Sequence, residues 1–391
     1  MSFSSLSLSR NITIIIIITL CTIYKPLKTH YAHNDKFSLE HTNVAPIGFP
    51  AKLISNTLNY YSYNNELKKS VDDPVSWNIL NINPKYKNYI LVIGESMRAD
   101  YMSLYGYPID TTPFLNSTNG FIIDGYISTA LNTQTSLQRI LYLNKNNQFS
   151  YQDNIITLAK NAGFETYWIS NQGKFGEFDT IAARVAFNAD NIHFTKKAGY
   201  NFTNVNDRKM LDILKGYVTE KQDKHRLFVL HLMGSHPEFC ERLESKPAIY
   251  FINQNMSCYL ETLTQTDLLI KEVIELFKSQ ENYSLIYFSD HGLSHKQNGD
   301  RFSMFVNNQY KQNYQVPFIK ISSDDKNRVF IKTQRSAFNF MSGFAEWLGV
   351  KEVTLSKSEG FFSDKQDDIK VFDGDKLIEF NTLQDDPAKL P

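Results

Sequence analysis

Short apolar runs of β type alternate with helical patterns from Pro84 onward, and this alternation constrains the fold more than any other feature. Buried strands that are connected through helices form a largely parallel sheet, with helices covering both faces. The predicted strands cover 89–93, 166–170, 227–232, 284–288 and 316–321. The predicted helices cover 155–162, 259–279 and 338–348. We therefore expect an α/β fold built on one mostly parallel sheet.

Polar side chains follow four of these predicted strands. Glu95 follows the first strand, Asn171 the second, His236 the third, and the pair Asp290-His291 the fourth. Ligands of open α/β sheets bind beyond the carboxyl ends of the strands, so these side chains should meet at one edge. Two carboxylates and an imidazole suit Zn²⁺ or Mn²⁺, which predicts a metal site at Glu95, Asp290 and His291. The alternative for Asp-His-Gly alone is an ordinary turn with a capping aspartate.

The N-terminus carries an apolar run of 13 residues, 12–24, between Arg10 and Lys25. As a helix this run would reach about 20 Å, which is shorter than a hydrocarbon core of about 30 Å. We expect residues 1–25 to be a short membrane anchor or a signal-like segment that directs the rest of the chain across a membrane.

Two further segments follow this anchor. Residues 26–86 are polar and rich in Asn and Tyr, which predicts a juxtamembrane segment with a helix near 50–68. Residues 87–391 contain the strand–helix alternation and are expected to form the catalytic domain.

The charges of the chain balance, with 41 Lys and Arg against 41 Asp and Glu. Nucleic acid is therefore not expected as a partner, because binding to a phosphate backbone requires a basic surface. Hydrophobic residues make up 42% of the chain, which is enough for a packed core and excludes a disordered protein.

Three cysteines are present. Cys21 lies in the apolar run, whereas Cys240 and Cys258 bracket a polar stretch. A disulfide between the latter two would suit an oxidising compartment, and two unrelated thiols fit the spacing equally well. The chain has no C-x-x-C motif, so neither a zinc ribbon nor a thioredoxin-type site is indicated.

Several motifs together resemble the phosphoethanolamine transferases of Gram-negative envelopes, members of the alkaline phosphatase/sulfatase superfamily. These are V-I-G-E-S-M-R-A-D at 92–100, Y-G-Y at 105–107, W-I-S-N at 168–171, H-L-M-G-S-H at 231–236 and Y-F-S-D-H-G at 287–292. The resemblance covers about residues 75–350 and keeps the order of the motifs. It implies a sulfatase-like domain in the periplasm, anchored in the bacterial inner membrane.

The resemblance also implies the central site residues. Glu95, Asp290 and His291 match zinc ligands, for one zinc ion or two. Thr133 matches the nucleophile, which is itself a zinc ligand, and Thr135 is the alternative register. Thr133 can also be interpreted as a helix N-cap, a role compatible with catalysis because a helix N-terminus favours phosphate.

Other residues acquire roles through the same resemblance. His236 matches a histidine that contacts the transferred phosphate or a second metal, and Asn171 matches a substrate-contacting position. His295 stands in for a later family histidine, with a surface-loop role as its alternative. The pair Cys240 and Cys258 falls where many members carry a disulfide.

The chain departs from the family pattern at three positions. Leu293 replaces an acidic residue after Asp-His-Gly, and Ser128 and Arg139 replace cysteines that flank the nucleophile in members that modify lipid A. The latter two replacements shift the likeness toward members that modify the core oligosaccharide.

The implied reaction transfers phosphoethanolamine from phosphatidylethanolamine to a sugar hydroxyl of lipopolysaccharide or lipooligosaccharide, through a covalent intermediate on Thr133. A sulfatase is disfavoured, because no C/S-x-P-x-R sequence lies near Thr133. The remaining alternatives are a phosphoglycerol transferase, a phosphodiesterase of the same superfamily, and a non-catalytic envelope protein.

Overall fold

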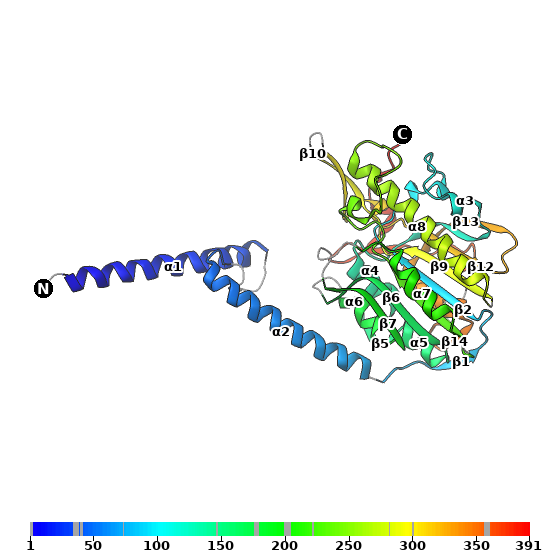
Figure 1. The fold of residues 1–391 in the computed structure, drawn as a ribbon, viewed down its shortest axis with the longest axis horizontal. Helices are drawn as coiled ribbons and strands as arrows, with labels where there is room; N and C mark the ends of the chain where they lie inside the picture. The colour runs from blue at the N-terminus through cyan, green and yellow to red at the C-terminus, as the bar shows by residue number, and fades with distance from the viewer. Residues whose placement is uncertain are drawn as a thin grey trace. The chain divides into compact units, whose positions relative to one another are not determined.

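The structure is a computed structural model of the chain, and Figure 1 shows its fold. It describes residues 3–33, 39, 42–72, 74–145, 148–175, 180–198, 205–220, 223–280, 282–298, 301–355 and 360–391. The chain divides into two compact units, Met1–Asp72 and Asp73–Pro391.

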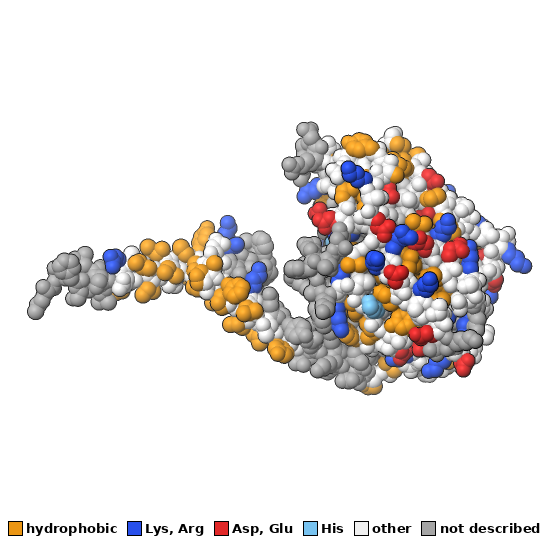
Figure 2. Space-filling model, viewed as in Figure 1, with side chains coloured by type: hydrophobic (Ala, Val, Ile, Leu, Met, Phe, Trp, Pro, Cys, Tyr) orange, Lys and Arg blue, Asp and Glu red, His pale blue; other side chains and the backbone are white. Residues whose placement is uncertain are grey.

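The first unit contains two helices, α1 (Phe3–His33) and α2 (Ala45–Asp72). Within α1, the 19 residues Arg10–Lys28 are long and apolar enough to cross a membrane, judged by length and composition, as a signal sequence also would be. Its isoleucines are exposed, and Figure 2 shows hydrophobic side chains gathered along this helix. Nineteen residues rise about 28 Å, so the residues that flank the apolar run supply the length that the run alone lacks.

The second unit begins at Asp73, inside the segment 26–86 that is expected to precede the catalytic domain, and the division between 26–86 and 87–391 stays a prediction. Strand β1 (Ile79–Ile82) pairs with β14 (Val350–Glu352), and the Ser76 backbone N–H donates to Asp153 over 2.7 Å. These partners lie far along the chain, so the local polar composition of this segment did not reveal them.

The core of this unit is an eight-stranded sheet in the order β13-β3-β12-β9-β2-β8-β6-β7. Only β12 runs antiparallel to its neighbours within this sheet, which confirms the predicted mostly parallel arrangement. All five predicted strands belong to the sheet. In spatial order the strands are β13 (Arg328–Ser336), β3 (Gly120–Ile127), β12 (Phe318–Ser322), β9 (Tyr283–Ser289), β2 (Asn88–Gly94), β8 (Arg226–His231), β6 (Glu165–Phe175) and β7 (Asn191–Ala198).

Helices cover both faces of this sheet (Figure 1). Along the buried strand β2, Tyr89, Leu91 and Ile93 face one core, whereas Ile90 and Val92 face the other, because side chains alternate along a strand. The first core is covered by α4 (Thr133–Leu141), α5 (Ile155–Asn161), α6 (Thr180–Ala186) and α9 (Phe340–Leu348). The second is covered by α3 (Pro113–Ser117), α7 (Lys209–Val218) and α8 (Gln254–Lys278).

Smaller elements complete the unit. Three two-stranded sheets are formed by β4 (Tyr142–Lys145) with β5 (Gln148–Asn154), β10 (Ser294–Asn298) with β11 (Arg301–Phe305), and β15 (Lys370–Phe372) with β16 (Leu377–Glu379). A short 3₁₀ helix, η4 (Phe239–Arg242), packs on α8.

Cys240 of η4 and Cys258 of α8 form a disulfide, with their Cα atoms 5.0 Å apart. The bridge closes a loop with a sequence separation of 18 residues. A chain-entropy argument for a loop of this length predicts that the double substitution Cys240→Ser/Cys258→Ser lowers the free energy of unfolding by about 3 kcal/mol. Denaturant unfolding under non-reducing conditions measures this loss. An unchanged midpoint would mean that the loop is ordered equally well without the bridge.

Candidate metal centre

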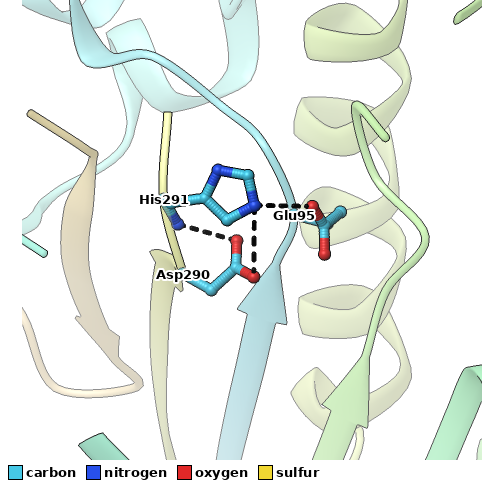
Figure 3. A group of neighbouring side chains, drawn as sticks. All are labelled: Glu95, Asp290 and His291. Carbon is cyan, nitrogen blue, oxygen red and sulfur yellow. Dashed lines mark hydrogen bonds and ion pairs between the residues drawn. The ribbon is translucent and has the colours of Figure 1, made fainter. Parts of the chain in front are cut away.

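The neighbouring strands β2 and β9 bring the predicted metal ligands together. Gly94 is paired with Ser289 at the ends of these parallel strands, so the next residues, Glu95 and Asp290, leave the sheet side by side. The His291 Nε2 atom lies 3.1 Å from Glu95 Oε1 and 3.9 Å from Asp290 Oδ2 (Figure 3). One potential ligand atom from each of the three residues lies within 4.8 Å of the others, and all three residues are buried.

Two backbone features hold Glu95 in place. Ser96 has a φ of 57°, in the left-handed region that is uncommon for a residue with a side chain. In this turn the Ser96 hydroxyl donates to Glu95 Oε1 over 2.7 Å, and its N–H donates to Asp290 Oδ1 over 3.3 Å. On the other side lies Gly234, with a φ of 47°, where a Cβ atom would be 3.0 Å from the Glu95 nitrogen. The turn after β8 therefore approaches Glu95 closely only because residue 234 is glycine.

Thr133 reaches the same cluster from the first position of α4. Its hydroxyl donates to Glu95 Oε2 over 2.8 Å and lies 3.3 Å from His291 Nε2. The N-cap of this helix is Asn132, which accepts from the Thr135 N–H over 3.1 Å, so Thr133 is the first helical residue and not the cap. The Thr135 hydroxyl donates to Asn132 Oδ1 over 2.8 Å and is therefore engaged in the cap.

The buried charges of the three predicted ligands depend on one another. Burial alone would raise the pKa of Glu95, but the charge and hydrogen bond of His291 lower this pKa well below its ordinary value. Burial and the negative charge of Glu95 raise the pKa of Asp290 to about 8. Burial opposes the charged form of His291, yet Asp290 and Glu95 raise its pKa to about 9. Without a bound metal, these pKa values favour an ionised Glu95, a protonated Asp290 and a cationic His291 at neutral pH.

The arrangement fits a divalent cation. Asp290 Oδ2 is buried and has no hydrogen-bond partner within the described part of the chain, which is unusual for a carboxylate oxygen. Carboxylate, imidazole and hydroxyl groups converge here from Glu95, Asp290, His291 and Thr133, a donor set that suits Zn²⁺ or Mn²⁺. These four residues are the ones that would hold the ion.

Metal binding at these ligands should release protons. The Asp290 and His291 side chains must lose their protons to become ligands, and their pKa values of about 8 and about 9 lie above neutral pH. Between pH 6 and 7.5, the apparent Zn²⁺ affinity is expected to rise by about 100-fold per pH unit, which corresponds to about two protons displaced. Competition with a chelating dye, corrected for the dye's own titration, measures the slope. A flat profile would contradict the protonated state of the pair.

The structure places Asn171 and His236 near this cluster in different ways. The Asn171 amide donates to Asp207 Oδ1 over 2.7 Å and to the Val205 carbonyl over 2.8 Å, and its oxygen accepts from Thr195, so its hydrogen bonds are internal. His236 is half-buried; burial lowers its pKa, and the charge of Glu95 acts in the opposite direction. The substrate contacts predicted for both residues stay predictions.

His295 lies in a separate polar cluster. Its Nδ1 atom is 2.7 Å from Asp386 Oδ1, and its Nε2 atom is 2.7 Å from the Tyr101 hydroxyl. Both ring nitrogens are thus engaged by residues outside the group of predicted metal ligands. The structure does not bring His295 together with Glu95, Asp290 and His291, and its predicted substrate contact is left without geometric support.

Two residues that the sequence did not single out support the site. The Gln172 amide donates to Glu95 Oε2 over 3.2 Å and to the Leu232 carbonyl over 2.8 Å. Asp207 accepts from the N–H groups of Met233 and Gly234, each over 2.8 Å, and so fixes the turn beside Glu95. Gln172 could have been predicted from the sequence, because it directly follows Asn171 at the end of a predicted strand. No motif or spacing in the sequence indicated that Asp207 supports the site.

The fold and the site together define the class of protein. Residues 87–350 match the sulfatase family, so the chain belongs to that family. A solved structure of the C-terminal periplasmic domain of EptC from Escherichia coli, in complex with Zn, shares the fold with a TM-score of 0.67 at 20% identity. It is matched over 79% of this chain and 96% of that one.

Within the family the chain belongs to the phosphoethanolamine transferases. It is 36% identical over 354 residues to the phosphoethanolamine transferase OpgE of Escherichia coli (strain K12), covering 90% of this chain and 67% of that protein. It is 35% identical over 268 residues to a putative phosphoethanolamine transferase of Haemophilus influenzae, covering 64% of this chain and 55% of that protein. The chain thus spans between about half and two thirds of the length of these relatives.

Proposed function

We propose that this protein transfers phosphoethanolamine from phosphatidylethanolamine to a sugar hydroxyl, through a covalent intermediate on Thr133. The observation that carries the proposal is the position of the Thr133 hydroxyl, 2.8 Å from Glu95 Oε2 and 3.3 Å from His291 Nε2. A hydroxyl in this place is at once a candidate nucleophile and a candidate metal ligand.

The chain's own residues account for most of the chemistry. The Thr133 oxygen forms a bond to phosphorus while the bond from phosphorus to the diacylglycerol oxygen breaks, and the Thr133 proton leaves with diacylglycerol. In the second half the sugar hydroxyl oxygen forms a bond to the same phosphorus, the bond from phosphorus to the Thr133 oxygen breaks, and the proton of the sugar hydroxyl returns to Thr133. A zinc ion, when bound by Glu95, Asp290 and His291, supplies a Lewis acid that lowers the pKa of the Thr133 hydroxyl and stabilises the phosphate charge. His236, on whose pKa the charges of Glu95 and His291 act, is the residue proposed to stabilise charge on the phosphate oxygens.

The proposed location is the bacterial inner membrane, with the second unit in the periplasm. The candidate span Arg10–Lys28 supports a membrane anchor. Such an anchor would keep the protein at the membrane, where the proposed lipid donor is located. The Cys240–Cys258 disulfide supports an oxidising compartment.

The proposed acceptor is a sugar hydroxyl of lipopolysaccharide or lipooligosaccharide. The names of the relatives above 30% identity specify the phosphoethanolamine group or a transferase, but no acceptor. A soluble envelope glucan is the acceptor that a direct comparison should include, because it offers the same hydroxyl chemistry.

The test is the intact mass of the purified chain after incubation with phosphatidylethanolamine in detergent and Zn²⁺. The expected result is a gain of one phosphoethanolamine group, which disappears when lipopolysaccharide is added. If the adduct disappears with a glucan but not with lipopolysaccharide, the protein is still a phosphoethanolamine transferase, and the glucan replaces lipopolysaccharide as its acceptor. A gain of a phosphoglycerol group from phosphatidylglycerol, with none from phosphatidylethanolamine, would overturn the proposed donor.

A further inference from the structure

A small, partly open pocket lies beside the candidate metal centre, and its lining includes none of the predicted ligands. Gly234 forms part of its wall, and the same glycine packs against Glu95. The opposite wall is one face of α8, because residues three and four apart lie on the same side of a helix. The lining residues on α8 are Thr262, Gln265, Thr266 and Leu269.

Arg242 lines this pocket with a guanidinium group whose charge is poorly compensated. Its side chain is 5% exposed, yet its Nε atom has no hydrogen-bond partner among the residues that the structure describes. The nearest carboxylate, Glu241, is 3.9 Å away and 59% exposed, and a contact from Nη2 to the Pro237 carbonyl measures 3.5 Å. Burial lowers the pKa of Arg242, and the charges of four carboxylates act in the opposite direction without offsetting it; these are Glu241, Asp207, Glu238 and Glu95. An unpaired buried charge is costly, so such a group usually has a partner.

The other charges of the pocket are already paired. Arg208 donates to Glu272 over 2.9 Å and to Glu244 over 3.2 Å. Asp207 accepts from Asn171 and from two backbone N–H groups. Arg208 carries the same charge as Arg242 and cannot compensate it, whereas Asp207 acts on Arg242 through its charge while its hydrogen bonds go to other groups.

The backbone that carries Arg242 is held rigidly. Two residues earlier, Cys240 is bonded to Cys258 of α8, and the Arg242 carbonyl accepts from the Asn206 amide over 3.0 Å. A guanidinium group with an unpaired Nε atom on a fixed backbone is suited to bind a ligand, because binding then costs little conformational entropy.

We infer that this pocket is a binding site for an oxyanion of the phosphate type, held by Arg242. A planar guanidinium group donates N–H bonds to phosphate, which suits the unpaired Nε donor and the weakly bonded Nη2 of Arg242. The group can be free phosphate or the phosphate of a sugar phosphate, since both present the same oxygens. The inference does not depend on the transfer reaction, because it concerns a separate set of residues.

The experiment measures the thermal unfolding of the full chain in buffer of constant ionic strength, with and without inorganic phosphate. At 100 times the dissociation constant, phosphate is expected to raise Tm by about 4 °C. In Arg242→Met this rise should vanish, whereas Arg208→Met, which removes an already paired charge at the same pocket, should keep it. Phosphate bound at the metal centre contributes equally to both variants. An equal response of Arg242→Met and the wild type, or an equal loss in both variants, overturns the inference.

The stability of the variants in phosphate-free buffer separates binding from a structural role. Arg242→Met should unfold at the wild-type Tm or above it, because it removes a buried charge whose burial outweighs the nearby carboxylates and whose Nε atom is unpaired. The control is Arg226→Met: Arg226 is also buried, but it donates to Asn88 over 2.8 Å and to two carbonyl groups, so its loss should lower Tm by about 5 °C. A similar fall in Tm in Arg242→Met would mean that Arg242 stabilises the fold, and it would overturn the inference of an anion-binding site.

Glucose 6-phosphate distinguishes the two sources of the anion. A larger rise in Tm than with inorganic phosphate, lost in Arg242→Met, supports a site for a sugar phosphate. An equal rise, also lost in that variant, supports a site for the phosphate group alone. A rise that persists in Arg242→Met excludes the pocket as the place where either compound binds.

Discussion

Replacement of Thr133 by alanine is expected to abolish the covalent adduct and to lower kcat by at least about 10³-fold, because it removes the proposed nucleophile. The substitution should leave the fold intact, since the Thr133 hydroxyl contacts the site and does not cap α4. Thr133→Ser keeps a hydroxyl and should keep an adduct, at a rate reduced by about 10- to 100-fold. Intact-mass analysis after a single turnover, followed by steady-state kinetics, measures both effects.

The matched control is Thr135→Ala. Its hydroxyl donates to Asn132 Oδ1 and O, so its loss weakens the cap of α4 without removing a group from the site. We expect a loss of stability of about 1 kcal/mol and an adduct that still forms. If the adduct disappears in Thr135→Ala and persists in Thr133→Ala, the nucleophile is two residues from the proposed position.

The second prediction concerns Glu95 and Asp290, two carboxyl groups that are both predicted metal ligands but differ in protonation. Without metal at pH 7, Asp290 is protonated because its pKa is raised to about 8, so Asp290→Asn exchanges one neutral group for another. Glu95 is ionised and compensates cationic His291 at 3.1 Å, so Glu95→Gln leaves a buried charge unpaired. In the metal-free protein we expect Glu95→Gln to lower the free energy of unfolding by about 3 kcal/mol, and Asp290→Asn by less than about 1 kcal/mol.

With zinc the difference between these variants should disappear. Both carboxylates are predicted ligands, so each variant should lose the stabilisation that Zn²⁺ confers on the wild type, and kcat should fall by at least about 10³-fold in both. Denaturant unfolding in EDTA and in Zn²⁺, together with calorimetric titration, measures these effects. Equal stability of the two variants in EDTA would contradict the assignment of the proton to Asp290, and retained zinc binding in either would remove that residue from the ligand set.

The five strands predicted from the sequence are those with uninterrupted apolar runs, and these strands are largely buried. The strands that were not predicted have identifiable reasons. β7 and β13 are the edge strands of the sheet, where one side lacks a neighbour and polar residues are tolerated. β3 lies inside the sheet but is interrupted by Gly125, whose φ of 118° breaks the regular pattern.

Glu95, Asp290 and His291 could be predicted as metal ligands because they closely follow apolar strands, whereas Thr133 was predicted through the family resemblance. Parallel strands end at the same edge, so the order of Glu95 and Asp290-His291 along the chain already implied their meeting. The choice between Asn171 and Gln172 could not be made in this way. Both lie in β6, where successive side chains point to opposite faces, and only the register of the folded strand directs Gln172 toward Glu95.

The sequence by itself determined the class of fold, the predicted metal ligands and the family, because these depend on local hydrophobic runs and on the residues next to them. The tertiary structure decided which polar groups find partners. It pairs His295 with Asp386, which lies 91 residues later in the chain, and it buries the guanidinium group of Arg242 with its Nε atom unpaired among the described residues. Such pairings depend on packing between segments that are far apart in the chain, and this packing cannot be predicted from the local pattern of apolar and polar residues.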